Sequence, residues 1–495
     1  MTDIKKLKND TVKGVFWSTT SHLYSYVIQF VITMILSRLL VPNDFATIGL
    51  LSIFTLLSNF IIDSGFAQSL IREKELKTRD YSSVFYFNFV VAIILYLVLF
   101  FCSPIIAGYF HILELKVISR IIFIQLIFNS LSIVPSVTLT RKMKYNEIAK
   151  VSVISITVSA VSGVSAALCG LGVYALVIQM LVLSFMKMIL LWIISKWHLT
   201  FEFSFSVIKR LFSFSMYLLL TSLIVTVFNN LYTLIIGRRF SQTQLGYYTQ
   251  AKKMEDIPSQ SITTMIASVS YTAMSKVKDD LNLLRIAYKK VLSMNVFIVA
   301  PIMMFCLVSA DSLIPFLFGE QWLPSIPYFR ILCIYGMIFP LFSINGNILK
   351  VLGLGKTYTI QEIIRRSLMV LFLIPTIKMG IEAMLWGWVL SMMISIVISF
   401  FLCGKPVGYT VFRQFADLFP VFMVIIIPML FPFVFYRMFE LSYFPMLIIQ
   451  FLLYFGLFIL LAKVFKIPAY TDVKNMLSKH PIVNKIIIQI NKKNK

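Results

Sequence analysis

Charged side chains inside a long apolar segment are the residues of this chain whose chemistry is easiest to anticipate. Lys252, Lys253, Glu255 and Asp256 lie close together and lead into a polar stretch that contains Gln260. Lys252 and Asp256 are four residues apart, so on a helix they share one face and can neutralise each other. Lys253 has no equally well placed acid, and such a cation is suited to binding a phosphate group. The alternative is that both lysines lie just outside the membrane and do nothing specific.

Uncharged polar residues repeat at helical spacing in the first and seventh apolar segments. His22 and Gln29 belong to one such stripe, and Asn229 belongs to the other. Hydroxyl and amide residues in membrane helices often only bond to neighbouring helices. The matched positions of the two stripes favour a shared hydrated cavity, for which His22, Gln29, Asn229 and Gln260 are the candidate lining residues.

Three further charged residues have two interpretations each. Arg38 and Arg238 end the first and seventh segments, where they either bind an anion or extend towards lipid headgroups. Asp63 is a lone acid near the end of the second segment. It either takes up a proton and couples transport to a gradient, or it caps a helix or pairs with Arg72.

A pair of arginines in the eleventh segment is also ambiguous. Arg365 and Arg366 follow Glu362 by about one helical turn, and the three residues could form an ion-pair cluster at the inner membrane surface. The sequence contains no pair of histidines at metal-ligand spacing and no glycine-rich phosphate loop. We therefore predict no metal, no cofactor and no catalytic residues.

The elements that position these residues are fourteen apolar segments, most of them about as long as a helix that crosses hydrocarbon. Hydrophobic residues make up 59% of the chain and charged residues 13%. Only helices and closed barrels satisfy their backbone polar groups in a bilayer, and these segments are too continuously apolar for barrel strands. The sequence predicts an all-α polytopic membrane protein of about fourteen spans.

The basic residues indicate the orientation of these spans. The net charge is +24, and most of the 45 lysines and arginines lie on every second connector and at the two termini. Positive residues favour the cytoplasmic side, so both termini are predicted to be cytoplasmic. Their spread over many connectors argues against a nucleic-acid partner, which would need them gathered in one module.

The two halves of the chain resemble each other. At a shift of 200 residues Gln29 aligns with Asn229 and Arg38 with Arg238, and at a shift of 210 Arg120 aligns with Arg330. We expect two six-helix bundles related by a pseudo-twofold axis along the membrane normal. The predicted divisions are a basic N-terminus (1–13), two bundles (14–200 and 201–404), an additional helix pair (405–466) and a basic tail (467–495).

Four short motifs together resemble the polysaccharide repeat-unit flippases. They are Ser37-Arg-Leu-Leu-Val-Pro-Asn-Asp-Phe45, Asp63-Ser-Gly-Phe-Ala-Gln68, Ile236-Gly-Arg-Arg-Phe240 followed by Leu245-Gly-Tyr-Tyr248, and Phe318-Gly-Glu-Gln-Trp322. The similarity runs from about residue 14 to residue 401. It is greatest to exporters of the colanic and teichuronic acid type, within the superfamily of multidrug, oligosaccharidyl-lipid and polysaccharide exporters.

This resemblance implies a function as well as a fold. The expected substrate is an undecaprenyl-diphosphate-linked oligosaccharide that is flipped across the bacterial inner membrane by alternating access for surface polysaccharide biosynthesis. A polysaccharide polymerase and chain-length machinery are candidate partners. Lys253, Arg38, Arg238 and Lys252 are the candidates to bind the diphosphate. The alternatives are a cation-coupled multidrug exporter of the same superfamily and an integral-membrane polysaccharide polymerase or ligase.

Overall fold

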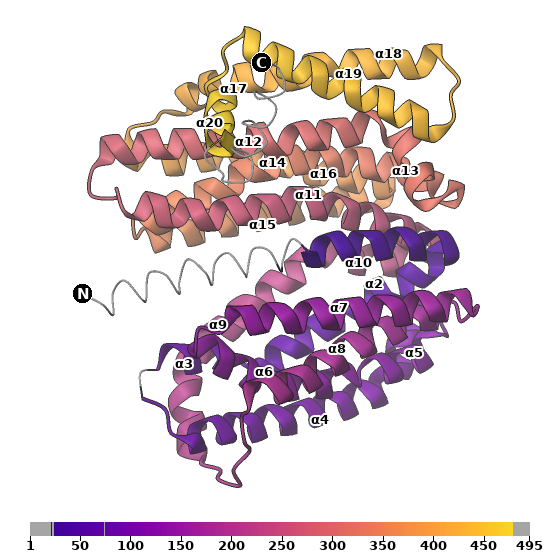
Figure 1. The fold of residues 1–495 in the computed structure, drawn as a ribbon, viewed down its shortest axis with the longest axis vertical. Coiled ribbons are helices and arrows are strands. Elements are labelled where there is room, and N and C mark those ends of the chain that lie inside the picture. Colours follow the sequence, from indigo (N-terminus) through magenta and orange to yellow (C-terminus); the bar gives the residue numbers. More distant parts are fainter. Residues whose placement is uncertain (1–20, 22–23, 74, 479–495) are drawn as a thin grey trace, which may run out of the picture. The chain divides into compact units, whose positions relative to one another are not determined.

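The computed structural model describes residue 21 and residues 24–73 and 75–478, and every regular element in this part of the chain is helical (Figure 1). The predicted all-α class is confirmed. Ten described helices are long and apolar enough to cross a membrane, or up to eleven with a bent pair, so the count of fourteen is not confirmed. Two helices over predicted segments, α11 (Gln242–Ser275) and α15 (Gly355–Thr376), are too polar to qualify.

The chain divides into two compact units, Met1–Thr249 and Gln250–Lys495. This boundary falls inside α11, whereas the division expected from the repeat falls at residue 200. The difference arises because α9 (Phe205–Asn229) and α10 (Leu231–Arg239) pack on helices of the first unit. The repeat-based division follows sequence similarity and not packing, and it stays a prediction.

The first unit is a bundle of long helices joined by short connectors. Besides α9, α10 and the first turns of α11, it contains the apolar helix Tyr24–Leu39, α2 (Pro42–Asp63), α3 (Phe66–Arg72), α4 (Thr78–Phe110), α5 (Leu115–Ile122), α6 (Gln125–Arg141), α7 (Tyr145–Leu168) and α8 (Val173–Ser195). The pair α9 and α10 bends by 45° where the two helices meet at Asn230.

The second unit is also a bundle of helices joined by short connectors. It contains the rest of α11, α12 (Leu281–Val308), α13 (Ala310–Phe318), η1 (Glu320–Ser325), α14 (Ile326–Val351), α15, η2 (Ile377–Met379), α16 (Ile381–Gly404), η3 (Lys405–Val407), α17 (Val411–Ile426), η4 (Ile427–Met429), α18 (Leu430–Met438), α19 (Tyr443–Val464) and α20 (Pro468–Ser478). In this unit α14 packs against both α12 and α16, and α15 packs against α16.

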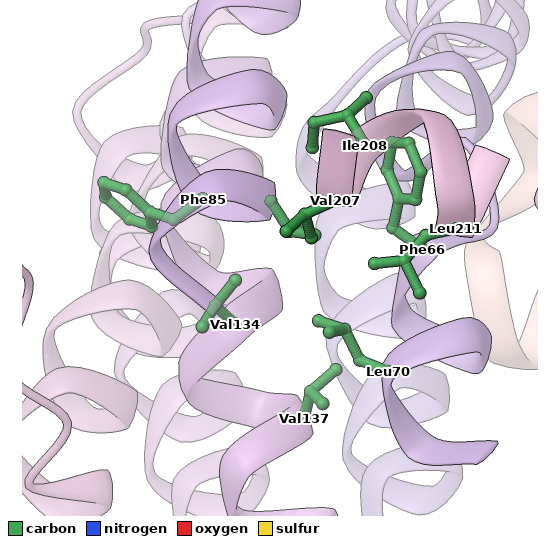
Figure 2. Packing of buried hydrophobic residues seen from close by; sticks show 9 residues of the cluster. Phe66, Leu70, Phe85, Val134, Val137, Val207, Ile208 and Leu211 are labelled. Carbon is green, nitrogen blue, oxygen red and sulfur yellow. The ribbon is translucent and has the colours of Figure 1, made fainter. Parts of the chain in front are cut away.

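A buried apolar cluster joins four helices of the first unit (Figure 2). Phe66 of α3, Phe85 of α4, Val134 of α6 and Leu211 of α9 meet there. A helix break directs Phe66 into this core, because Gly65 adopts a left-handed backbone conformation with a φ of 73°. Glycine tolerates this conformation without steric cost. The cluster anchors the N-terminal part of α9 to the first unit.

Contacts within the first unit connect residues that the repeat makes equivalent. Thr243 Oγ1 donates a hydrogen bond of 2.8 Å to Asn43 Oδ1, and the two residues are 200 apart in sequence. Gly49 packs against Thr249 at the same shift. Residues contact their own counterparts only near a twofold axis. The beginnings of α2 and α11 therefore lie side by side within the first unit, as a twofold relation would require, and the relation between the two predicted bundles stays a prediction.

The two helix starts are also built alike. The backbone N–H of Val41 donates to Asp44 Oδ2 at 3.1 Å, and the backbone N–H of Ser241 donates to Gln244 Oε1 at 3.2 Å. An acceptor three residues into the helix satisfies an N–H group that would otherwise lack a partner. Asp44 and Gln244 are 200 residues apart, so the resemblance between these two segments includes local helix capping.

Candidate functional site

Helix α11 is polar on two sides, which is unusual for a helix inside a membrane protein. On one side Glu255, Ser259 and Thr263 follow one another at four-residue spacing and are fully buried. Another side carries Lys253 and Gln260, which are only half-buried. A polar face in the bilayer needs water or polar partners, so this open side is unsuited to lipid.

The buried side of α11 contains a compact ion-pair cluster. Lys252 Nζ lies 2.6 Å from Glu255 Oε2 and 2.7 Å from Asp256 Oδ1. The pairing of Lys252 with Asp256 that the sequence suggests is therefore present, and Glu255 adds a second acid. Glu255 is fully buried, and Ser259 donates a hydrogen bond to its carboxylate. Burying a carboxylate is costly unless it is paired in this way.

Two aromatic rings complete this cluster. The ammonium nitrogen of Lys252 lies 5.3 Å from the ring centre of Tyr335 on α14 and 5.1 Å from that of Trp388 on α16. Such cation–π contacts attract an ammonium group to the faces of the two rings. Sequence reasoning missed both rings, since neither residue is distinctive among the many aromatic residues of the chain.

Lys253 lies outside this cluster. It is half-buried, and no described carboxylate forms an ion pair with it. Gln260, on the same open side, donates its amide to the carboxylate of Asp256. The open side of α11 thus presents a cation and an amide group together, an arrangement that is able to bind a phosphate and a sugar hydroxyl.

The other predicted cavity residues have different surroundings. Gln29 on the first described helix and Asn229 at the end of α9 are both exposed. Asn230, next to Asn229, donates its side-chain amide to the carbonyl of Thr226 at 2.9 Å. His22 lies outside the described residues. The roles of Gln29 and Asn229 in sugar binding stay predictions.

The two predicted arginines at the ends of the first and seventh segments are both exposed. Arg238 Nη1 lies 2.5 Å from His111 Nε2, and its guanidinium carbon lies 4.9 Å from the ring centre of Tyr109. These two contacts hold Arg238 against the C-terminal end of α4, because Tyr109 lies in the last turn of this helix and His111 directly follows it. Both arginines belong to the first unit, whereas Lys253 belongs to the second. Their binding of diphosphate stays a prediction.

Asp63 ends α2 and faces the start of α3. Its Oδ1 accepts the backbone N–H of Ala67 at 3.0 Å. This is a capping contact, one of the two roles considered for this acid. Proton coupling through Asp63 stays a prediction.

Among the described residues no group of three histidine, cysteine, aspartate or glutamate side chains is arranged to hold a metal.

Solved structures define the fold class. The chain is similar to a structure of "Lipid II flippase MurJ, inward closed conformation", with a TM-score of 0.72 and 14% identity over 92% of this chain and 99% of the other. It is also similar to an inward-facing multidrug resistance MATE family transporter of the MOP superfamily, with a TM-score of 0.59 and 15% identity over 78% and 94%. The fold is that of these membrane transporters.

The family follows from sequence comparison. Residues 35–327 match the family described as polysaccharide biosynthesis protein, and the chain belongs to this family. A similar protein from Bacillus subtilis (strain 168), "Teichuronic acid biosynthesis protein TuaB", is 25% identical over 69% of this chain and 71% of its own length. "Lipopolysaccharide biosynthesis protein WzxC" from Escherichia coli (strain K12) is 22% identical over 83% and 84%. The resemblance seen in the motifs is confirmed.

Proposed function

We propose that this protein flips undecaprenyl-diphosphate-linked oligosaccharide repeat units across the bacterial inner membrane for surface polysaccharide biosynthesis. Family membership and the names of the relatives support the substrate class. "Succinoglycan biosynthesis transport protein ExoT" from Rhizobium meliloti (strain 1021), a further relative at 24% identity, supports transport as the activity. Similarity to a lipid II flippase in fold supports a lipid-linked substrate that moves by alternating access.

The single observation that carries the site is Lys253 on the open polar side of α11. A diphosphate cannot cross hydrocarbon without compensation of its negative charge. Lys253 offers a cation without a competing acid among the described residues, and Gln260 lies further along the same side. We infer that the diphosphate binds Lys253, with Arg38 and Arg238 as further candidates, whereas Glu255 and Asp256 already compensate the charge of Lys252.

The charges of α11 make the multidrug-exporter alternative less suitable. A site for cationic drugs needs acids that are free to bind a cation; Glu255 is fully buried, and Asp256, whose side chain is 39% exposed, already binds Lys252 together with Glu255. We further propose that both termini are cytoplasmic, that the protein acts as a transporter and not as an enzyme, and that a polysaccharide polymerase and chain-length machinery use its product.

The test is transport of a labelled undecaprenyl-diphosphate oligosaccharide in proteoliposomes. Lys253→Gln should slow transport about tenfold to a hundredfold, because a hydrogen bond to a charged group contributes about 1.5–3 kcal/mol. Lys276→Gln is the matched control, since Lys276 is exposed just beyond the end of α11. An unchanged rate in Lys253→Gln would exclude the site. No transport by the wild-type protein would exclude the function.

A further inference from the structure

Helix α15 carries two arginines near its middle and not at its end. Arg365 and Arg366 lie about halfway between Gly355 and Thr376. Their side chains are 16% and 11% exposed, so both are largely enclosed by protein. Enclosing an arginine in protein is costly unless its charge is paired and its donors find acceptors. The ion pairs with Glu362 that the sequence allowed are present, and their position relative to the inner membrane surface stays a prediction.

The two arginines share a single acid. Glu362 Oε2 lies 2.9 Å from Arg365 Nη2 and 3.5 Å from Arg366 Nη2. The guanidinium carbon of Arg365 also lies 5.0 Å from the ring centre of Phe342 on α14. One carboxylate thus serves two guanidinium groups, and an aromatic ring orients one of them.

The hydrogen bonding of Arg365 is incomplete. Its Nε–H is buried and has no acceptor among the described residues. A buried donor without a partner costs about 1–3 kcal/mol. Glu362 occupies only the Nη2 position of the guanidinium group. An oxyanion that enters beside Glu362 would supply the missing acceptor.

This pair and the cluster on α11 contact the same helix, α14. Lys252 lies 5.3 Å from the ring centre of Tyr335, and Arg365 contacts Phe342, which is seven residues further along α14. A spacing of seven residues places the two rings on one face of the helix, about two turns apart. All these residues belong to the second unit, so their proximity is independent of how the two units are arranged.

We propose that Arg365 and Arg366 form a second anion subsite, which binds a singly charged oxyanion on the glycan, such as a sugar carboxylate. The inference rests on the proposed function and adds to it a preference for acidic glycans. A planar guanidinium fork matches a carboxylate in shape. Two guanidinium groups that already share one acid suit an anion of one charge better than a diphosphate.

The experiment compares two substrates in proteoliposomes. Both are undecaprenyl-diphosphate oligosaccharides, and they differ only in one sugar, which is glucuronic acid in one and glucose in the other. Arg365→Gln and Arg366→Gln should slow the acidic substrate about tenfold to a hundredfold and leave the neutral substrate within about twofold. Arg365→Lys keeps the charge but removes Nε–H, and it should slow the acidic substrate alone. Lys356→Gln, an exposed change on the same helix, should affect neither.

The outcomes separate the two proposals. Only variants that elute like the wild-type protein in size-exclusion chromatography are compared. Equal slowing of both substrates, or no slowing of either, would overturn the glycan-anion subsite while leaving the flippase function in place. Failure of the wild-type protein to move either substrate would overturn the proposed function and the subsite with it.

Discussion

At the scale of single residues, one glycine allows two helix backbones to approach closely. Gly246 belongs to the Leu245–Tyr248 motif and lies in the second turn of α11, where it packs on the first residue of α2. A Cβ atom at this position would lie 2.0 Å from the carbonyl oxygen of Pro42. No side chain fits such a distance without a shift of the backbone. The glycine is therefore required by packing, and the motif reflects structure as well as function.

We expect Gly246→Ala to lower the free energy of unfolding by about 1–3 kcal/mol or more, because the added methyl group overlaps backbone that cannot rotate away. Thermal unfolding of the purified protein, followed by tryptophan fluorescence, measures the effect. Gly456→Ala is the control, since a Cβ on this glycine of α19 would meet nothing within 4 Å. Equal stability of the two variants would show that α2 and α11 do not approach as described.

At the scale of elements, helix starts are fixed by local hydrogen bonds. The carboxylate of Asp280 accepts the backbone N–H groups of Asn282 and Leu283, at 2.9 and 3.1 Å, at the beginning of α12. These donors have no partner within the helix. The cap fixes the start of α12, which packs against α14 in the interior of the second unit.

Asp280→Ala should therefore cost about 0.5–2 kcal/mol of stability. The neighbouring Asp279→Ala removes the same charge from an exposed position that makes no such contact, and it should be close to neutral. Unfolding temperatures of the two variants, measured in the same detergent, give the comparison. A loss of stability in both variants would mean that net charge, and not capping, is responsible.

At the scale of the whole molecule, the contact between Asn43 and Thr243 leads to a prediction about transport. Thr243 and Asn43 are hydrogen-bonded at the starts of α11 and α2, on the side that the basic residues assign as outer. In the proposed alternating access, the outer ends of the two predicted repeats separate, and the contact between Asn43 and Thr243 must then break in each cycle.

A disulfide between Asn43→Cys and Thr243→Cys should form on oxidation, since the side chains already touch, and it should stop transport. Reductant should restore transport. The background lacks the five native cysteines. Each single cysteine variant, treated with the same oxidant, is the control and should remain active. Full transport by the cross-linked protein would exclude separation at this point.

The sequence by itself determined the properties that depend on local composition. Apolar length predicts the helical membrane class, and the shift of 200 residues relates Asn43 to Thr243, which are hydrogen-bonded to each other. The polar character of α11 and the pairing of Lys252 with Asp256 also follow from neighbours on one helix. These features can be predicted without knowledge of the packing, because they depend on residues of one helix or on the similarity between two segments.

Only the tertiary structure decided which distant residues meet. It places Tyr335 and Trp388 over Lys252, holds Arg238 against His111, and packs Arg365 against Phe342 of α14. It also separates α2 from α3 at Ser64 and Gly65, and it bends the chain at Asn230 without a proline. The physical reason is that such contacts depend on how several helices pack together, and helical periodicity within one segment contains no information about the partner segment.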